Sequence, residues 1–301
     1  MGRKALVTGA SGFVGSYLCP ALISNGYEVH SLSETRCDIR DYQSVQELIS
    51  RVQPQLIYHL AAMSFVPACQ ADLDKTIAVN VSGTHNLLKA SMESGLRPKM
   101  IFISTANLYG KVSADQIPIT EATKVQPENN YALSKYMAEA VVQMYARETD
   151  AETVIFRPFN HIGPGQLDKF VVSSFAKQLI EIKKGMKEPV MAVGNLSPKR
   201  DFTDVRDIVR AYVSAGEVGS GIYNLCSDTA YSIQDLLDRL IKISGVECSV
   251  ERDQERYRKN DLPVLSGNPA KAYQDLGWEA EIALDQSLED ILDYWDAQLT
   301  G

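Results

Sequence analysis

The 301-residue sequence has few cysteines, and their arrangement excludes two kinds of cross-linked protein. The five cysteines are odd in number and include no C-x-x-C pair. That arrangement argues against a disulfide framework and against a tetrahedral zinc site. We therefore expect no metal site, and a reducing compartment, the cytoplasm, as the location of the protein.

The sequence also lacks a long apolar run and an excess of basic residues. No segment approaches the roughly 20 apolar residues of a membrane span. Met1 leads almost directly into an apolar run at Ala5, without the regions of a signal peptide. The net charge of −8 disfavours nonspecific attraction to nucleic acid or to an anionic membrane. We therefore expect neither as a partner, and a small ligand whose negative charges are met by a few placed cations.

The first half of the sequence alternates short β-branched runs with longer helical patterns. Segments such as Ser44–Val52 and Tyr131–Arg147 carry apolar residues at three-to-four spacing, as helices packed on a sheet do. The alternation predicts an α/β fold with a Rossmann-type, doubly wound parallel sheet. The predicted strands are Lys4–Thr8, Glu28–Leu32, Leu56–Leu60, Lys99–Ser104 and Thr153–Arg157.

The sequence changes in character after Arg157, which predicts a second, smaller α/β region. A Gly- and Pro-containing segment, His161–Gly165, is predicted to be a loop, and Phe170–Lys184 a helix. Asp204–Ala215 and Gly221–Leu225 resemble the earlier helices and strands. The predicted division is a first domain of residues 1–160, with 202–225 returning to it, and a second domain of residues 161–201 and 226–301.

A glycine-rich turn follows the first predicted strand and precedes an amphipathic stretch, Val14–Ile23. Glycines at this spacing let the chain turn tightly and let a pyrophosphate approach backbone N–H groups at a helix start. A turn that binds nothing is the alternative, but the strand before it and the helix after it favour a dinucleotide site. The residues assigned to this site are Gly9, Ser11, Gly12, Phe13, Val14 and Gly15.

The end of the second predicted strand bears on which dinucleotide is preferred. An acid at this corner favours NAD through the ribose, whereas a basic residue favours the 2′-phosphate of NADP. Ser33 stands where we expect the acid, and Arg36 is available to pair with a phosphate. We therefore predict NADP(H), while Glu34 keeps NAD(H) open. Asp38 and Ile39 follow as candidate adenine contacts, although Asp38 is equally a turn or cap residue.

Tyr131 and Lys135 are predicted to lie one helical turn apart on the same face. A phenol has a reference pKa of about 10, and an adjacent ammonium lowers that pKa by favouring the phenolate. Thr105 follows the fourth predicted strand, so its hydroxyl can lie beside Tyr131 and donate to a substrate carbonyl. An exposed helix face and a strand-end cap are the alternatives, but ligands of such sheets bind at this edge. We predict that Thr105, Tyr131 and Lys135 are catalytic, and that Tyr131 and Lys135 also contact the cofactor, Lys135 at the nicotinamide ribose.

Five motifs together carry a family resemblance over nearly the whole chain. They resemble the extended short-chain dehydrogenases/reductases that act on nucleotide sugars. The resemblance implies that Leu60, Ala61 and Ala62 line the cofactor site, that the first domain binds the cofactor, and that the second binds the substrate. The motifs are Gly9-x-x-Gly12-x-x-Gly15, His59-Leu-Ala-Ala62, Asn80-x-x-Gly83-Thr84, Thr105…Tyr109-Gly110 and Tyr131-x-x-x-Lys135.

Within that family, motifs in the second half resemble the reductases of GDP-linked 4-keto-6-deoxyhexoses. These motifs are Arg157-Pro-Phe-Asn-His-Ile-Gly-Pro-Gly-Gln166, Val193-Gly-Asn195, Arg200-Asp-Phe-Thr-Asp-Val-Arg-Asp207 and Arg258…Pro263. The planar guanidinium groups of Arg200 and Arg258 can bind phosphates bidentately, although surface ion pairing is the alternative for both. The substrate contacts that the resemblance implies are Thr105, Ala106, Asn160, Lys169, Val171, Asn195, Arg200 and Arg258.

Two residues beside Thr105 separate the chemistries of this family. The 4,6-dehydratases place an acid in this stretch, whereas here Ala106 and Asn107 occupy it, and neither is a general acid. We therefore predict reduction of the C4 ketone of GDP-4-keto-6-deoxy-D-mannose to GDP-D-rhamnose by NAD(P)H, with Tyr131 as the proton donor.

Several alternatives stay open at this point. One is a nucleotide-sugar C4 epimerase with tightly bound NAD, and another is a noncatalytic redox sensor, which the intact Tyr131 and Lys135 disfavour. The residues decide neither the nucleotide base nor the face that receives the hydride, which separates a rhamnose from a talose product. Met137 and Met144 belong to an apolar stripe that is predicted to be core or, by the resemblance, part of a homodimer interface.

Overall fold

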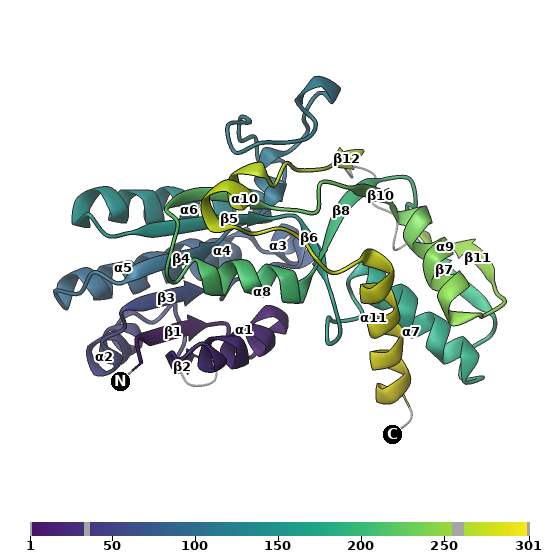
Figure 1. Cartoon of the computed structure of the whole chain (residues 1–301), viewed down its shortest axis with the longest axis horizontal. Helices are drawn as coiled ribbons and strands as arrows, with labels where there is room; N and C mark the ends of the chain where they lie inside the picture. Colours follow the sequence, from purple (N-terminus) through teal and green to yellow (C-terminus); the bar gives the residue numbers. More distant parts are fainter. Residues whose placement is uncertain (1, 33–36, 255–261, 300–301) are drawn as a thin grey trace.

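Six parallel strands form the larger sheet, in the order β2-β1-β3-β4-β5-β9 (Figure 1). The computed structural model describes residues 2–32, 37–254 and 262–299, so Ser33, Arg36 and Arg258 lie outside the described residues. The doubly wound parallel sheet predicted from the sequence is confirmed, and the predicted strand ends differ by one residue at most. The strands are β1 (Lys4–Thr8), β2 (Glu28–Leu32), β3 (Leu56–His59), β4 (Lys99–Ile103), β5 (Thr153–Pro158) and β9 (Gly221–Leu225).

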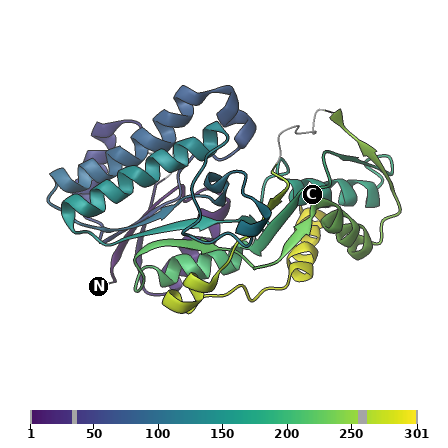
Figure 2. The ribbon, with the colours of Figure 1, turned by 90° about the horizontal axis from the view of Figure 1, so that it is seen from above.

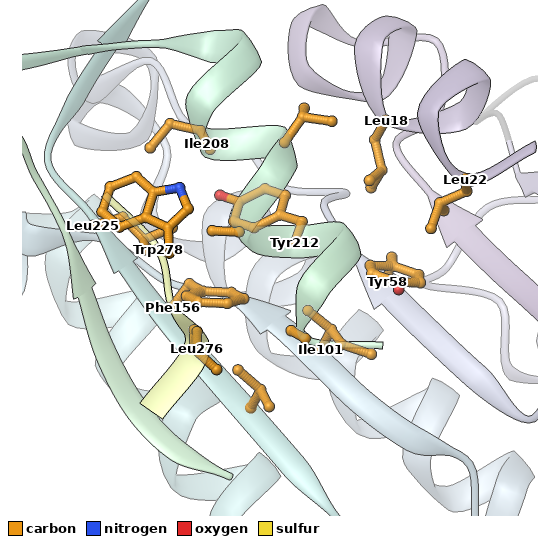
Figure 3. Close-up of a cluster of buried hydrophobic side chains, with 14 of the residues drawn as sticks. Leu18, Leu22, Tyr58, Ile101, Phe156, Ile208, Tyr212, Leu225, Leu276 and Trp278 are labelled. Atoms are coloured by element: carbon orange, nitrogen blue, oxygen red, sulfur yellow. The ribbon is translucent and has the colours of Figure 1, made fainter. Parts of the chain in front are cut away.

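Helices cover both faces of this sheet, and for this reason its strands are apolar on both sides. One face carries α2 (Tyr42–Val52), α5 (Gly83–Glu93) and α6 (Asn130–Thr149). The other carries α1 (Phe13–Ser24), α8 (Val205–Ser214) and α10 (Ala270–Leu276). On that second face, the Tyr212 ring of α8 packs on the Phe156 ring of β5, with ring centres 5.1 Å apart (Figure 3). The buried aromatic and aliphatic side chains hold the helices at fixed positions against the sheet.

Short helices fill the connections of the larger part at the carboxyl ends of β3 and β4. They are α3 (Val66–Ala71), α4 (Leu73–Ile77), the π-helical turn η1 (Ala78–Ser82), and the 3-10 turns η2 (Ala106–Tyr109) and η3 (Ala114–Gln116). No helix among the described residues is long and apolar enough to cross a membrane.

A smaller α/β part lies beyond the carboxyl ends of the large sheet, and the two parts are visible as two lobes in Figure 2. Its own core joins α7, α9 and α11 to the short strands. Strand β8 pairs with β6, β10 and β12, and β7 pairs with β11. The elements are β6 (Asn160–Ile162), α7 (Val171–Lys183), β7 (Val190–Val193), β8 (Lys199–Asp204), β10 (Ala230–Ser232), α9 (Ile233–Ser244), β11 (Ser249–Arg252), β12 (Val264–Leu265) and α11 (Leu284–Gln298).

The predicted loop His161–Gly165 is wrong at its start, because Asn160–Ile162 forms β6. Its residues pair in parallel with β8, Asn160 opposite Phe202. A three-residue strand has too short a pattern to be recognised, and its partner lies some 40 residues further along the chain. The pairing matters for the site, since it places Asn160 and β8 side by side.

Asp207 of α8 fastens the connection between α10 and α11 to the larger part. Its buried carboxylate accepts hydrogen bonds from the backbone N–H of Glu281 (3.0 Å) and Ile282 (2.9 Å), and pairs with Arg210 (2.7 Å). The Trp278 indole donates to the Asp207 carbonyl at 2.7 Å. These hydrogen bonds hold the segment between α10 and α11 in place. Helix α10 itself packs in the core against β9.

Replacing Asp207 by Ala should lower the free energy of unfolding by about 3 kcal/mol, because two backbone donors and Arg210 lose their acceptor. Urea unfolding followed by circular dichroism measures this change. The control is Asp285→Ala, which removes an exposed ion pair with Arg239 and should cost less than about 1 kcal/mol. Equal losses in the two variants would contradict the assigned role.

Candidate active site

A cleft of about 2560 Å³ lies at the carboxyl ends of the parallel strands and extends onto the smaller part. Ligands of doubly wound folds bind at this edge of the sheet. All of the predicted site residues that the structure describes line the cleft. They are Gly9, Ser11, Gly12, Phe13, Val14, Gly15, Asp38, Ile39, Leu60, Ala61, Ala62, Thr105, Ala106, Tyr131, Lys135, Asn160, Lys169, Val171, Asn195 and Arg200.

The glycine turn lies at the point where the strand order reverses, because β1 has β2 on one side and β3 on the other. Gly9 has a φ of 70°, and the Gly12 N–H donates to its carbonyl at 3.0 Å. A Cβ on Gly15 would stand 2.4 Å from the Gly9 carbonyl oxygen. The turn therefore needs glycine, and it presents the start of α1, with its unpaired N–H groups, to an anion in the cleft.

A buried histidine holds the wall beside this turn. The His59 ring is hydrogen-bonded to the hydroxyl of Thr8 (2.7 Å) on one side and to that of Thr84 (2.8 Å) on the other. The Thr8 hydroxyl also accepts from the Ala61 N–H at 3.1 Å. Burial, with the charge of Lys135 second, lowers the pKa of His59 to about 3, so the ring is neutral. His59 fixes the Leu60–Ala62 segment and is not an acid–base group.

Asp38 is a turn residue, which is one of the two roles predicted for it; the other is an adenine contact. Its carboxylate accepts from the Arg40 backbone N–H and the Arg40 guanidinium, both at 2.9 Å. These hydrogen bonds hold the pKa of Asp38 below its ordinary value. Because Asp38 also lines the cleft, the turn role and the adenine contact are compatible.

Thr105 and Tyr131 are brought together although 26 residues separate them in the sequence. Thr105 caps η2, its hydroxyl accepting from the Asn107 N–H at 3.2 Å, and it is hydrogen-bonded to Tyr131. Tyr131 lies in the first turn of α6, which begins there because the Asn129 side chain accepts from the Ala132 N–H at 2.9 Å. The two hydroxyl groups form a polar pair in the cleft.

Lys135 points from α6 toward the sheet, and its ammonium lies 4.2 Å from the centre of the Phe102 ring. We expected this ammonium to lower the pKa of Tyr131, and the structure does not show that effect. Burial raises the pKa of Tyr131 to about 12, and the hydrogen bond with Thr105 acts in the opposite direction. Burial also lowers the pKa of Lys135 to about 7. Desolvation, which the sequence cannot reveal, is the largest cause in both cases.

The predicted substrate residues come from the smaller part and face the same cleft. Asn160 begins β6, and Arg200, largely buried, lies on the neighbouring β8, its guanidinium donating to the Lys199 carbonyl at 2.8 Å. The Asn195 carboxamide caps a local turn, accepting from the Ser197 N–H at 3.1 Å. A phosphate or sugar in the cleft can therefore meet an amide and a guanidinium from adjacent strands.

Phe65 is a cleft residue that the sequence analysis missed. The Lys169 ammonium lies 4.9 Å from the centre of its ring and 5.7 Å from that of Phe170. The two rings meet edge to face with centres 6.2 Å apart, across the cleft between the two parts. The only signal in the sequence was an aromatic residue in the loop after the third strand, a position that any buried Phe can occupy.

His161, which is not among the predicted catalytic residues, also lines the cleft. Its ring stacks on Phe13 of the glycine turn with centres 6.1 Å apart, and burial lowers its pKa. Among the described residues, no group of three or more His, Cys, Asp or Glu side chains is arranged to hold a metal ion.

Comparisons with known proteins agree with this geometry. The model of the NAD dependent epimerase/dehydratase family matches residues 5–226. The chain is 34% identical to GDP-6-deoxy-D-mannose reductase from Pseudomonas aeruginosa, over 99% of both chains. It is 31% identical to GDP-6-deoxy-D-talose 4-dehydrogenase from Aggregatibacter actinomycetemcomitans, over 91% of both chains.

Among solved structures, RMD from Pseudomonas aeruginosa complexed with NADPH is similar with a TM-score of 0.92 and 33% identity, over 98% of this chain and 99% of that chain. Family, fold and cleft thus point to the same kind of enzyme. The chain belongs to the NAD dependent epimerase/dehydratase family, the extended short-chain dehydrogenases/reductases that the motifs predicted, and is an NAD(P)-dependent oxidoreductase.

Proposed function

We propose that the protein reduces the C4 ketone of GDP-4-keto-6-deoxy-D-mannose to GDP-D-rhamnose, with NADPH as the hydride donor. The observation that carries the proposal is the cleft itself, which Thr105, Tyr131 and Lys135 line together, with no acid at Ala106 and Asn107. The full-length similarity to GDP-6-deoxy-D-mannose reductase supports the sugar, and the NADPH complex of RMD supports the cofactor.

Bound NADPH would supply the hydride that adds to the C4 carbon of the sugar. Tyr131 donates its proton to the ketone oxygen, which becomes the new hydroxyl group. Its pKa of about 12 keeps the phenol protonated at neutral pH, as a proton donor must be. Thr105, hydrogen-bonded to Tyr131, is placed to hold the ketone oxygen, and Lys135 to hold the nicotinamide ribose.

We extend the proposal to the ligands that the two domains bind. Residues 1–160, with 202–225, bind the cofactor through the glycine turn and the 60–62 segment. Residues 161–201 and 226–301 bind the sugar nucleotide, with Asn160 at the boundary. Arg200 is the proposed diphosphate ligand in the described cleft, with Arg258 as its partner outside the described residues, and a reducing cytoplasm agrees with five cysteines that are all free.

The variant Tyr131→Phe tests the chemistry. It should lower kcat for NADPH-dependent reduction of GDP-4-keto-6-deoxymannose by about 100- to 10,000-fold, because the proton donor is lost. NADPH affinity, measured by fluorescence titration, should stay at the wild-type value, since the ring remains. Normal turnover by the variant would overturn the assignment of Tyr131.

The product and the cofactor balance discriminate among the related activities. NMR of the sugar distinguishes GDP-rhamnose, which we expect, from GDP-6-deoxytalose, the other product of hydride delivery to C4. Stoichiometric NAD in the purified protein without net NADPH consumption would instead favour the C4 epimerase, an activity that the family description includes. Consumption of NADH in preference to NADPH would contradict the proposed cofactor.

The variant Gly15→Ala tests the cofactor site. Its Cβ would meet the backbone oxygens of Gly9 and Ala10 at 2.4 and 2.6 Å, so the turn must shift. We expect a cost of about 1–3 kcal/mol and a loss of NADPH affinity of about tenfold or more, measured by fluorescence titration. Ile23→Ala, at an exposed position of the same helix that does not line the cleft, is the control and should bind normally. Unchanged affinity in Gly15→Ala would place the cofactor elsewhere.

We further propose that the protein forms a homodimer through the outer face of α5 and α6. Large apolar side chains are exposed there as a group, and such groups are rare on the surface of a monomer. Four of them lie on α6 and one on α5: Leu133, Tyr136, Met137, Met144 and Met92. The apolar stripe predicted from the sequence thus has an exposed part that a second copy can cover.

Met137→Glu combined with Met144→Glu should convert the dimer to a monomer, because burying two carboxylates at the interface is unfavourable. Light scattering after size exclusion measures the mass. Met186→Glu, at a more exposed apolar position after α7, is the control and should remain dimeric. A monomeric wild-type protein would refute this interface.

A further inference from the structure

A buried ion pair lies one helical turn from Lys135. Glu139 follows Lys135 by four residues on α6, so the two side chains share a face. The Glu139 carboxylate accepts hydrogen bonds from Arg157 of β5, from Nε at 3.0 Å and from Nη2 at 2.7 Å. The side chains of Arg157 and Glu139 are only 4% and 1% exposed. Removing two charges from water is costly, so the position of such a pair calls for an explanation.

The pair is fixed in place by a hydrogen-bonded chain. Arg157 donates from Nη1 to the Tyr109 hydroxyl at 3.1 Å, and Tyr109 donates to the Asn224 side chain at 2.7 Å. Asn224 in turn donates to the Ile119 carbonyl at 3.0 Å. The chain ties α6 to β5, η2 and β9, and it directs the guanidinium away from the cleft. The carboxylate is held by Arg157, and it belongs to the residue one helical turn from Lys135 on α6.

The surroundings of the Lys135 ammonium leave Glu139 as its source of negative charge. The Phe102 ring covers it, and His59 of β3, which is neutral, lies nearby and interacts with it electrostatically. Glu139 acts on the ammonium in the opposite sense to burial, raising the pKa that burial lowers. Tyr131, at the other end of this face of α6, is protonated at neutral pH.

Two titratable groups on other elements packed against α6 are already engaged by hydrogen bonds. Arg157 of β5 is bonded to Tyr109 of η2 and to Glu139. Cys69 of α3 acts on Tyr131, and burial keeps its thiol protonated. Among the described residues, Glu139 is the carboxylate that lies one helical turn from Lys135 on the same face and opposes the effect of burial on its pKa.

We propose that Glu139 is a positioning residue that keeps Lys135 in its ammonium form, and that Arg157 tunes this effect by sharing the carboxylate. The proposal rests on the function proposed for the same site, in which Lys135 holds the nicotinamide ribose. An ammonium donates stronger, charge-assisted hydrogen bonds to the ribose hydroxyl groups than an uncharged amine does. The ion pair, although it does not touch the ligands, thus sets the pH range of the site.

The signs of the expected changes follow from the charges. Activity is lost as pH rises through the pKa of Lys135, because the ammonium loses its proton. Glu139→Gln removes the negative charge, lowers that pKa and moves the alkaline limit of activity to lower pH. Arg157→Gln removes the positive charge that shares the Glu139 carboxylate. It therefore raises the pKa of Lys135 and moves the alkaline limit of activity to higher pH. A charge within about 4–6 Å shifts a pKa by about one unit or more, so displacements of about one pH unit are expected.

The experiment compares pH profiles of kcat and of NADPH affinity for the wild type and four variants. Glu139→Asp keeps the charge and should return the limit close to the wild-type pH. Tyr109→Phe breaks the hydrogen-bonded chain without changing a charge, and its limit should not move. The double variant Glu139→Gln/Arg157→Gln removes both members of the ion pair, and its limit should lie below that of the wild type, so it serves where a single variant does not fold.

Displacements of the same sign in Glu139→Gln and Arg157→Gln would overturn the proposal, as would a Tyr109→Phe profile that matches Glu139→Gln. Either result would show that the pair only supports the fold. NADPH affinity needs no sugar, so it tests Glu139 even if the wild type fails to reduce GDP-4-keto-6-deoxymannose. Absence of turnover in the wild type would count against the proposed substrate alone.

Discussion

The packing of one face of α6 on the sheet is the contact on which the site depends. Ala138 and Val142 are buried against the strands, and the Tyr145 hydroxyl donates to the Pro98 carbonyl at 3.3 Å, so the helix cannot rotate. The same face carries Tyr131, Lys135 and Glu139 at intervals of four residues. The apolar contacts therefore fix the direction of three polar side chains that the cleft needs.

Polar groups on a buried face lose hydration, and the site makes use of that loss. Tyr131 becomes a weaker acid and stays protonated, which suits a donor of a proton to a ketone. Lys135 becomes a stronger acid, and this opposes its role as a cation. The ion pair of Glu139 and Arg157 counters the second effect without supplying a charge to the cleft itself. Burial thus favours the proposed role of Tyr131, whereas its effect on Lys135 has to be offset by a nearby negative charge.

Much of this arrangement could be predicted from the sequence, because it depends on local patterns. Strand ends such as Thr8 and Leu32, and the glycine turn, follow from residue type and spacing over a few residues. Contacts between distant segments could not be predicted: β6 needs β8 as its partner, and Lys169 meets Phe65 from the other side of the cleft. These contacts exist only after both parts have folded, and no local periodicity encodes them.

The expectation that Lys135 would acidify Tyr131 failed for the same reason. Spacing of four residues shows that two side chains share a face, but not that burial outweighs the attraction between them. In the proposed reduction each turnover consumes the proton of Tyr131, and solvent has to return a proton before the next. Glu139 contributes to this cycle only through Lys135, whose charge it is proposed to maintain for binding of the cofactor.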